Sequence, residues 1–357
     1  MKNLTLFSDH SGYQGYSASE NMEYPNVSHC VEENHVHYND GSYKTQYFTL
    51  EPLEDGLFNI FYSDTYTARY TGGTYFEYSI DGGATWERIT YDENVDYVET
   101  EPIVVKEGDK IMLRGINDSL CCGFWNSGLV CCGFNLYRSV EHPNETIRFN
   151  AYGNVASLVL GENFSQISKF KVGYCCFASL FKGTGIVDAS NVILPFIKLN
   201  AFKNDDDTAG KYCYASMFQD CENLIAAPKL PAKKLTDFCY SHMFYGCTSL
   251  TDAPELPATK LSDYCYDNMF NGCESLTTAP ELLAETLVEG CYSNMFSTCR
   301  NINSITCLAT DISADNCTAY WFYRHSESGT FKKAESMEDW TRGINGIPEG
   351  WTIENVQ

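Results

Sequence analysis

Apolar residues recur at fixed positions in a 26-residue phrase that repeats through the carboxyl-terminal half of the chain. The near-copies begin at Cys213, Cys239, Cys265 and Cys291, and a degraded fifth copy begins at Cys317. Counted from its first cysteine as zero, each copy is apolar at positions 0, 1, 4, 5 and 8. In the second copy these are Cys239, Tyr240, Met243, Phe244 and Cys247. This stripe, two residues wide, predicts a short helix with one buried side.

The second half of each copy predicts an extended segment. Leu250 is followed by TDAPELPA, in which Pro254 and Pro257 cannot continue a helix. One strand and one short helix per repeat are typical of leucine-rich-repeat architecture, in which each unit buries its apolar face against its neighbours. We therefore expect a leucine-rich-repeat-like solenoid over 144–317 and a C-terminal cap over 318–357. The cap would be anchored by Phe331, Trp340, Ile347 and Trp351.

Residues 46–143 predict an antiparallel β-sandwich. Short aromatic or β-branched runs such as LFNIFYS, TYFEYSI and KIMLRGI are separated by Gly, Asp and Asn turns. The turn SIDGGATW, from Ser79 to Trp86, fits the pattern called an Asp box, in which Asp81 bonds to backbone amides of the turn. Sialidase-like enzymes carry several such boxes, whereas this part of the chain shows one, so we interpret it as a structural hairpin. The overall prediction is a mixed α/β and β fold.

Residues 1–45 are polar and irregular, which is typical of an extended arm that docks onto another molecule. The first residues, MKNLTLFSDHSGYQGY, lack the apolar core and cleavage site of a secretory signal. No stretch approaches the roughly 18–20 apolar residues that span a bilayer. We therefore expect the protein either to stay inside the cell or to leave it in an assembled particle.

The net charge of −23 excludes the most common modes of binding to polyanions. Nucleic-acid binding through phosphates needs clustered Lys and Arg, and adsorption to an anionic membrane needs the same. We expect neither nucleic-acid binding nor membrane insertion.

The cysteines and tyrosines of the repeats are expected to be core residues. Cys213 and Cys221 lie eight residues apart, about 12 Å along a helix, whereas a disulfide needs Cα atoms within about 7 Å. We interpret the repeat cysteines as reduced, small buried hydrophobes, with cross-links between adjacent coils as the alternative. The Tyr ladder is interpreted as core rather than as a sugar-stacking surface; it comprises Tyr214, Tyr240, Tyr266 and Tyr292.

The chain offers no recognisable catalytic set and implies no cofactor. The candidates for metal ligands are weak and lie in the arm: His29, Cys30, His35 and His37. A second group, Cys121, Cys122, Cys131 and Cys132, is interpreted as buried thiols of a hairpin. The His within the full repeats, His242, stands at a position that varies between copies, and we expect it to be a solvated side chain.

Several phrases resemble known families. CYSHMFYGCTSL and APELPATKLSDYCYDNMF resemble the 26-residue, leucine-rich-like repeats of surface proteins of gut Bacteroidetes and their phages. EYSIDGGATW ahead of the repeats and GIPEGWTI after them are similar to flanks in the same group. The arm segment PNVSHCVEENHVHYN resembles a leader of virion proteins, of head-fibre or decoration type, in crAss-like gut phages. The resemblance implies an attachment arm followed by an exposed display module.

These observations lead to a functional hypothesis with two alternatives. The first is a non-enzymatic phage virion protein, made in the host cytoplasm and exposed on the particle. Residues 1–45 would bind a capsid or fibre-base protein, and the repeats would bind a glycan or protein of the host surface. Such fibres are often homo-oligomers, usually trimers. The alternatives are a cell-surface adhesin of the bacterium itself and, third, a glycan-processing enzyme.

Overall fold

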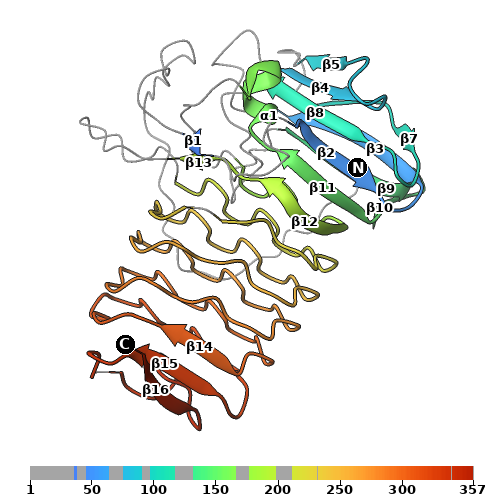
Figure 1. Cartoon of the computed structure of the whole chain (residues 1–357). Coiled ribbons are helices and arrows are strands. Elements are labelled where there is room, and N and C mark those ends of the chain that lie inside the picture. Colours follow the sequence, from blue (N-terminus) through green and yellow to red (C-terminus); the bar gives the residue numbers. More distant parts are fainter. Residues whose placement is uncertain are drawn as a thin grey trace.

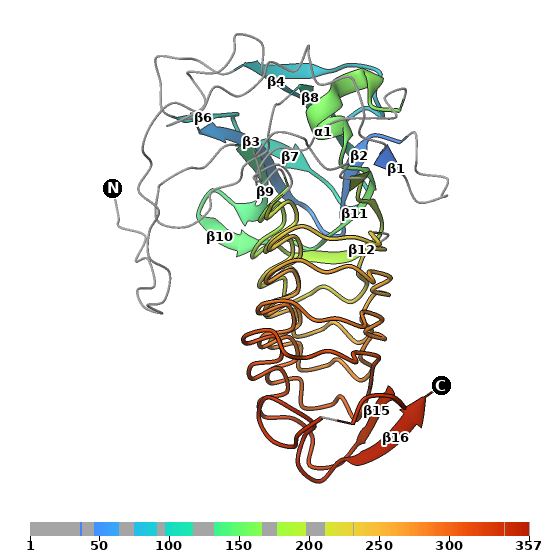
Figure 2. The same cartoon turned by 90° about the vertical axis from the view of Figure 1, so that its left-hand side faces the viewer.

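The computed structural model places β-sheets at one end of the molecule and a column of stacked coils extending from them (Figure 1, Figure 2). The structure describes residues 36–37, 46–63, 75–90, 97–116, 132–165, 177–197, 211–230, 232–338 and 340–356. The arm, residues 1–45, therefore lies outside the described residues except for Val36 and His37.

Two sheets form the upper end. The first has the order β12-β11-β2-β8-β4-β5, and its strands are β12 (Ile186–Ile193), β11 (Phe149–Asn154), β2 (Phe48–Pro52), β8 (Ile111–Ile116), β4 (Tyr75–Ser79) and β5 (Glu87–Thr90). The second contains β10 (His142–Thr146), β9 (Cys132–Ser139), β3 (Gly56–Ser63), β6 (Tyr97–Glu99) and β7 (Ile103–Val105). Neighbouring strands are antiparallel, except that β12 runs parallel to β11.

The two sheets share an aromatic core because alternate side chains of each strand point inward. Phe48 of β2 contacts Phe134 of β9, with ring centroids 6.2 Å apart, and Phe58 of β3 contacts Tyr78 of β4 at 6.0 Å. Phe181 lies in the first coil of the stack, which precedes the copy that begins at Cys213, and it contacts Phe48 and Phe134 as well. The core of the sheets therefore continues directly into the coil stack.

The edge strand of the first sheet leads into the stack. Asp188 of β12 forms a parallel bridge with Ala226, and further parallel bridges join Lys234 to Lys260 and Asp252 to Thr278. The stack ends in a parallel sheet of β14 (Ser304–Cys307), β15 (Thr330–Ala334) and β16 (Thr352–Val356). A short antiparallel pair, β1 (Val36–His37) with β13 (Phe196–Ile197), completes the described strands.

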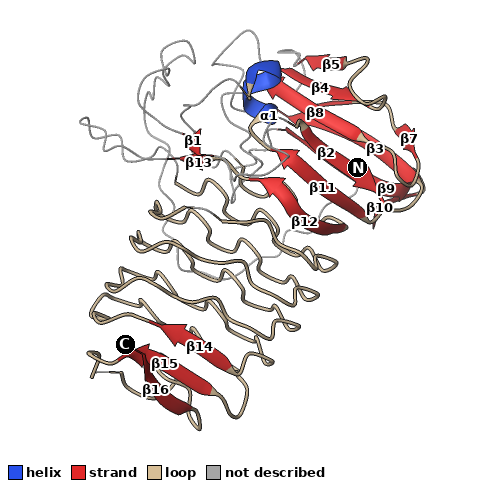
Figure 3. Cartoon of the chain, in the orientation of Figure 1, coloured by secondary structure: helices blue, strands red, loops and turns tan. Residues whose placement is uncertain are grey.

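The predicted mixed α/β fold with a leucine-rich-repeat-like solenoid is wrong. The helices among the described residues are α1 (Ser157–Leu160) and the single 3₁₀ turn η3 (Gly161–Asn163), and neither lies in a 26-residue copy. Figure 3 shows the copies as loops and turns between strands. The described part is thus nearly all β, and its coils do not form the closed strand-and-helix unit that we predicted.

The helix prediction fails because the backbone amides of each copy alternate between two partners. The N–H of Tyr214 donates to the carbonyl of Cys239 in the next coil (3.0 Å), whereas the N–H of Ala215 donates back to Tyr212 (3.1 Å). Ser216 and Met217 repeat the alternation. An α-helix would keep every N–H within its own turn, so half of these amides instead join neighbouring coils.

The backbone conformation follows the same four-residue rhythm. Positive φ angles fall on every fourth residue, for example at Phe238 (56°), His242 (56°) and Gly246 (72°). Each such residue ends a turn, which a helix would not allow. The apolar stripe at positions 0, 1, 4, 5 and 8 therefore has a period of four, and over nine residues it resembles the helical period of 3.6.

The segments made of these turns stack into one side of the column, which we call the turn wall. It comprises residues 212–221, 238–247, 264–273, 290–299 and 316–325.

Aromatic rings stack on one another through the coils. Phe218, Phe244, Phe270 and Phe296 follow one another with centroids 5.5–5.6 Å apart, and all four are fully buried. The Tyr ladder forms a second stack, and its side chains are 1–3% exposed. The interpretation of these tyrosines as core residues is confirmed. The four apolar anchors proposed for residues 318–357 are also buried.

The ten cysteines whose side chains the structure describes are unbonded and buried, as the reduced-thiol interpretation predicted. The second thiol of each copy also has a polar role. Cys247 donates its S–H to the carbonyl of Phe218 (3.0 Å), and Cys273 donates to Phe244 (3.1 Å). Each carbonyl lies in the preceding coil and already accepts a backbone N–H, that of Cys221 for Phe218 and that of Cys247 for Phe244 (both 3.1 Å), so the thiol adds a second hydrogen bond that joins the two coils.

The same thiols are expected to be unreactive in the native protein. Burial raises the pKa of Cys221 and of Cys239 to about 12, so the reactive thiolate is scarce at neutral pH. Labelling with N-ethylmaleimide at pH 7, followed by peptide mass spectrometry, should leave the ten described cysteines unmodified until denaturant is added. Rapid native labelling of Cys239 or Cys247 would contradict the stacked-coil arrangement.

Candidate functional site

The Asp-box turn is built as a structural hairpin between β4 and β5. The Asp81 carboxylate accepts hydrogen bonds from the Thr85 hydroxyl (2.6 Å), the Thr85 N–H (2.9 Å) and the Ser79 hydroxyl (2.7 Å). These bonds, those from Thr85 foremost, hold the pKa of Asp81 well below its ordinary range. Since its acceptors are used inside the turn, Asp81 has the role that the hairpin interpretation gave it.

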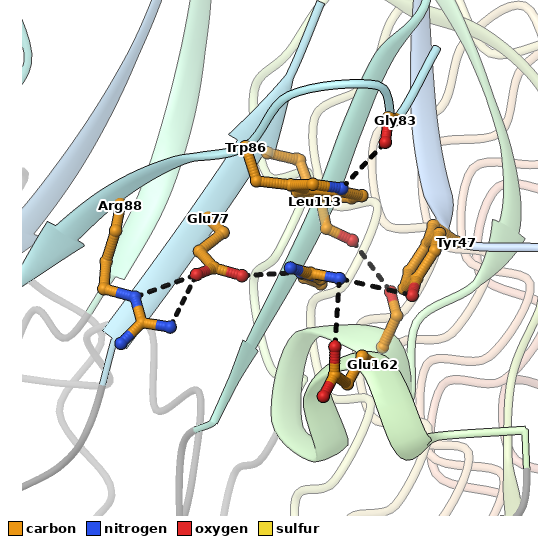
Figure 4. Close-up of polar contacts among 9 residues, drawn as sticks. Tyr47, Glu77, Gly83, Trp86, Arg88, Leu113 and Glu162 are labelled. Carbon is orange, nitrogen blue, oxygen red and sulfur yellow. Dashed lines mark hydrogen bonds and ion pairs between the residues drawn. The ribbon is translucent and has the colours of Figure 1, made fainter.

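A polar cluster lies beside this turn, on the first sheet (Figure 4). Glu77 is 5% exposed and contacts two arginines. Arg114 Nε lies 2.6 Å from one carboxylate oxygen, and Arg88 lies 2.7 Å from the other. Arg114 also stacks over Trp86, with its guanidinium carbon 4.0 Å from the ring.

The cluster joins elements that are distant in the sequence. Arg114 belongs to β8 and Glu77 to β4, and the guanidinium further reaches Glu162 of η3 at 3.7 Å and the Tyr47 hydroxyl at 3.4 Å. Burial alone would raise the pKa of Glu77, but the hydrogen bonds from Arg88 and Arg114 outweigh it and lower the pKa. A general base needs an oxygen that is ready to take a proton. Both oxygens of Glu77 accept hydrogen bonds from arginines, so the cluster has a structural role. We call Glu77, Arg88 and Arg114 the structural lock.

The turn wall is the second candidate surface, since the residues that vary between copies lie on it. Positions 3 and 6 are partly exposed in most copies, although Ser216 and Ser297 are buried, and in the third copy they carry amides that belong to a hydrogen-bonded ladder. Asn271 donates to Asn268 (2.8 Å), Asn268 donates to Asp267 (2.9 Å), and Thr298 donates to Asn271 (3.4 Å). The ladder crosses from one coil to the next and presents neutral polar groups.

The side chains at position 2 and the side chain of His242 are more buried than the sequence predicted. Position 2 was assigned to the surface with the other variable positions, yet Ser241 and Asp267 are only 5% and 6% exposed. His242 was expected to be solvated, but its side chain is three-quarters buried, and its Nδ1 lies 2.8 Å from the Ser241 hydroxyl. Burial, with a smaller contribution from the charge of Lys182, lowers the pKa of His242 to about 4, so the ring is neutral at pH 7.

Asp267 should make stability depend on pH. Burial raises the pKa of Asp267 to about 6, although hydrogen bonds from Asn268 and Ser293 oppose the shift. The unfolded chain therefore loses this proton first as pH rises from about 4, and a penalty on folding grows until about pH 6. Relative to wild type, Asp267→Asn should gain up to about 3 kcal/mol of unfolding free energy between pH 4 and pH 7. Urea unfolding at both pH values measures this difference, and an equal difference at both would contradict it.

The degraded fifth copy ends the turn wall with exposed aromatics. Tyr320 is 51% exposed and Tyr323 is 42% exposed, and their ring centroids lie 6.4 Å apart at a nearly perpendicular angle. Arg324 lies over the Tyr323 ring at 5.3 Å. We call these three residues the tip site. Sequence analysis did not single them out, although Tyr320 and Tyr323 occupy positions 3 and 6 of the fifth copy, which are variable positions in the others.

Most of the weak metal candidates are not placed. His29, Cys30 and His35 lie outside the described residues, and of His37 only the backbone, in β1, is described. Cys121, Cys122 and Cys131 also lie outside, and Cys132 begins β9. Within the ranges that the structure describes, no group of three or more His, Cys, Asp or Glu side chains is placed to hold a metal ion.

Two further findings bear on function. Comparison of the chain with known protein families, with curated proteins and with solved structures finds no match. In the described part of the chain, the longest α-helix is four residues, which is too short to cross a membrane.

Proposed function

We propose that this chain is a non-enzymatic virion surface protein of a phage, of head-fibre or decoration type. Residues 1–45 attach it to a capsid or fibre-base protein, and the repeats present the turn wall and the tip site to a glycan or protein of the host surface. The attachment role rests on the resemblance of PNVSHCVEENHVHYN to leaders of virion proteins.

The observation that carries the proposal is the separation between the two ends of the molecule. The described residues that directly follow the arm lead into β2 in the sheets, while the last coil and its cap, with β15 and β16, lie at the far end of the stack (Figure 2). The last coil carries the tip site. Between them, the turn wall carries the half-buried amides of Asn268 and Asn271. A chain held by its amino-terminal arm would thus expose this surface and the tip site to an approaching cell.

The proposal has a direct test in the particle itself. Mass spectrometry of purified virions should detect this chain, and deletion of residues 1–45 should abolish its incorporation while leaving the coil stack folded, although it removes the short β1–β13 pair. Absence of the chain from the particles would remove the proposal. Incorporation of the truncated protein would show that the arm is not the attachment segment.

A second assay addresses the display role. Fluorescently labelled full-length protein should bind intact host cells, and an excess of unlabelled protein should compete. If the protein is part of the virion but leaves cells unlabelled, host binding by the repeats is wrong and the chain has only a role in the particle.

A further inference from the structure

Exposed apolar side chains are concentrated at the end of the stack. Of the eight large apolar side chains that are exposed in the described residues, four belong to the last coil and its cap: Tyr320, Tyr323, Ile344 and Ile353. The loop that carries Ile344 lies against the tip site, because the Tyr320 N–H donates to the side-chain oxygen of Asn345 (3.0 Å). Such a concentration of exposed apolar area is typical of an interaction site.

The two exposed tyrosines are not needed to close the core. Trp321, which lies between them in the sequence, is fully buried, and it stacks on Trp340 with centroids 5.4 Å apart. Trp351 covers Phe322 from the other side at 5.4 Å. Since these indoles already cover the last coil, core packing does not explain why Tyr320 and Tyr323 are aromatic.

We infer that Tyr320, Tyr323 and Arg324 form a binding site for a neutral saccharide, an inference that rests on the proposed function and names the ligand class of its display surface. A pyranose presents C–H groups on its ring face and hydroxyls on its edge. One tyrosine ring offers a face for stacking, while the second stands nearly perpendicular to it at 85° and flanks the sugar. The Arg324 guanidinium, held over Tyr323, supplies donors for the hydroxyls.

The area of the site favours a saccharide over a protein partner. With about 200 Å² for a fully exposed tyrosine, the two rings together present on the order of 200 Å². A stable protein interface buries about 800 Å² on each partner. The area of the tip site corresponds to one or two sugar rings.

The charge around the site favours a neutral sugar over an acidic one. The last coils carry exposed carboxylates at Asp315, Glu327 and Glu349, and Arg324 is the cation that stacks on the site. The whole chain carries a net charge of −23, which repels a sialylated or sulfated chain. Two coils closer to the sheets, the half-buried amides of Asn268 and Asn271 add uncharged donors and acceptors to the same wall.

The test uses the full-length chain on an array of immobilised oligosaccharides. The neutral probes are chains of glucose, galactose, mannose, xylose and N-acetylglucosamine, and the acidic probes are sialylated and sulfated chains. Wild-type protein should bind at least one neutral chain. The double variant Tyr320→Ala/Tyr323→Ala should lose at least tenfold in affinity for it, measured by titration calorimetry, with its unfolding midpoint unchanged.

A matched control separates this site from the rest of the turn wall. Tyr245 occupies the same repeat position as Tyr323, three coils closer to the sheets, and Tyr245→Ala should retain wild-type affinity. Tyr320→Phe/Tyr323→Phe keeps the ring faces and should retain binding by stacking. The inference is wrong if wild type binds no saccharide, if it binds only acidic chains, or if the double alanine variant keeps its affinity.

These outcomes are distinguishable from a failure of the proposed function. If the protein binds host cells but none of the saccharides, the ligand is a protein and only this inference is lost. If the protein is absent from virions, the proposed function is lost, whereas the saccharide titrations stand as measured.

Discussion

Replacement of Phe270 by alanine should lower the unfolding free energy by about 3–5 kcal/mol, the range for removing a buried phenylalanine. Phe270 is fully buried in the middle of the coil stack, between Phe244 and Phe296, and each of the two ring contacts spans 5.6 Å. The stack is rigid on both sides because each coil is hydrogen-bonded to the next, for example by the Phe270 N–H to the Met295 carbonyl (2.9 Å). A cavity left at this place therefore has little chance to collapse. Guanidinium unfolding followed by tryptophan fluorescence measures the loss.

The matched control is Glu281→Ala, an exposed site in the same repeat, which should change the unfolding free energy by less than about 0.5 kcal/mol. Phe270→Leu should fall between the two because it retains much of the buried apolar area. A Phe270→Ala loss as small as that of Glu281→Ala would mean that the rings do not form a continuous stack.

Replacement of Arg114 by methionine should cost about 3 kcal/mol. The change removes one of the two partners of the buried Glu77 carboxylate and the contact with the Trp86 ring. Breaking a buried pair costs about 3–5 kcal/mol because the remaining charge is left without compensation. We place the value at the lower end since Arg88 still contacts the other oxygen of Glu77. Thermal or urea unfolding at pH 7 provides the measurement.

Two controls identify the lock as the cause. Arg88→Met should cost less than Arg114→Met, since the Arg88 side chain is 51% exposed and that of Arg114 only 15%. The double variant Glu77→Leu/Arg114→Met should be more stable than Arg114→Met alone, because no charge is then left buried. Additive effects of the two changes would show that the residues do not act as a pair.

The lock also has a pH signature. The arginines hold the pKa of Glu77 below its ordinary value, so its stabilising contribution is complete above the pKa of the carboxyl in the unfolded chain. That contribution is lost as pH falls through the lower pKa of the folded state. The stability difference between wild type and Arg114→Met should accordingly shrink in acid.

The sequence located the core of the repeats correctly but not the backbone that carries it. Cys239, Tyr240, Met243 and Phe244 are buried as predicted, since a side chain's burial follows from its own apolarity and its recurrence. The prediction of a helix was wrong because an apolar stripe with a period of four residues and one with a period of 3.6 coincide over nine residues. Only hydrogen bonds to a neighbouring coil, such as Tyr240 N–H to the Cys265 carbonyl, distinguish the two.

The candidate sites also divide into a local one, which the sequence predicted, and contacts between distant segments, which it did not predict. The Asp-box turn is local, so its bonds between Ser79, Asp81 and Thr85 followed from the spacing of these residues. The Glu77–Arg114 pair joins residues 37 positions apart, and no local pattern indicates which carboxylate meets which guanidinium. His242 and Asp267 were placed by their variability between copies, which does not show how far a neighbouring coil covers them.

The sequence by itself thus determined the repeat period and the apolar positions that build the core, whereas the structure decided between free thiols and cross-links for the ten described cysteines. The tertiary structure alone decided that the copies form turns instead of helices, that Arg114 locks Glu77, and that Tyr320 and Tyr323 lie together at the end of the stack. The physical reason is the range of the interactions. Burial of one side chain depends on its own chemistry, whereas a hydrogen bond or ion pair depends on which distant segment the fold brings beside it.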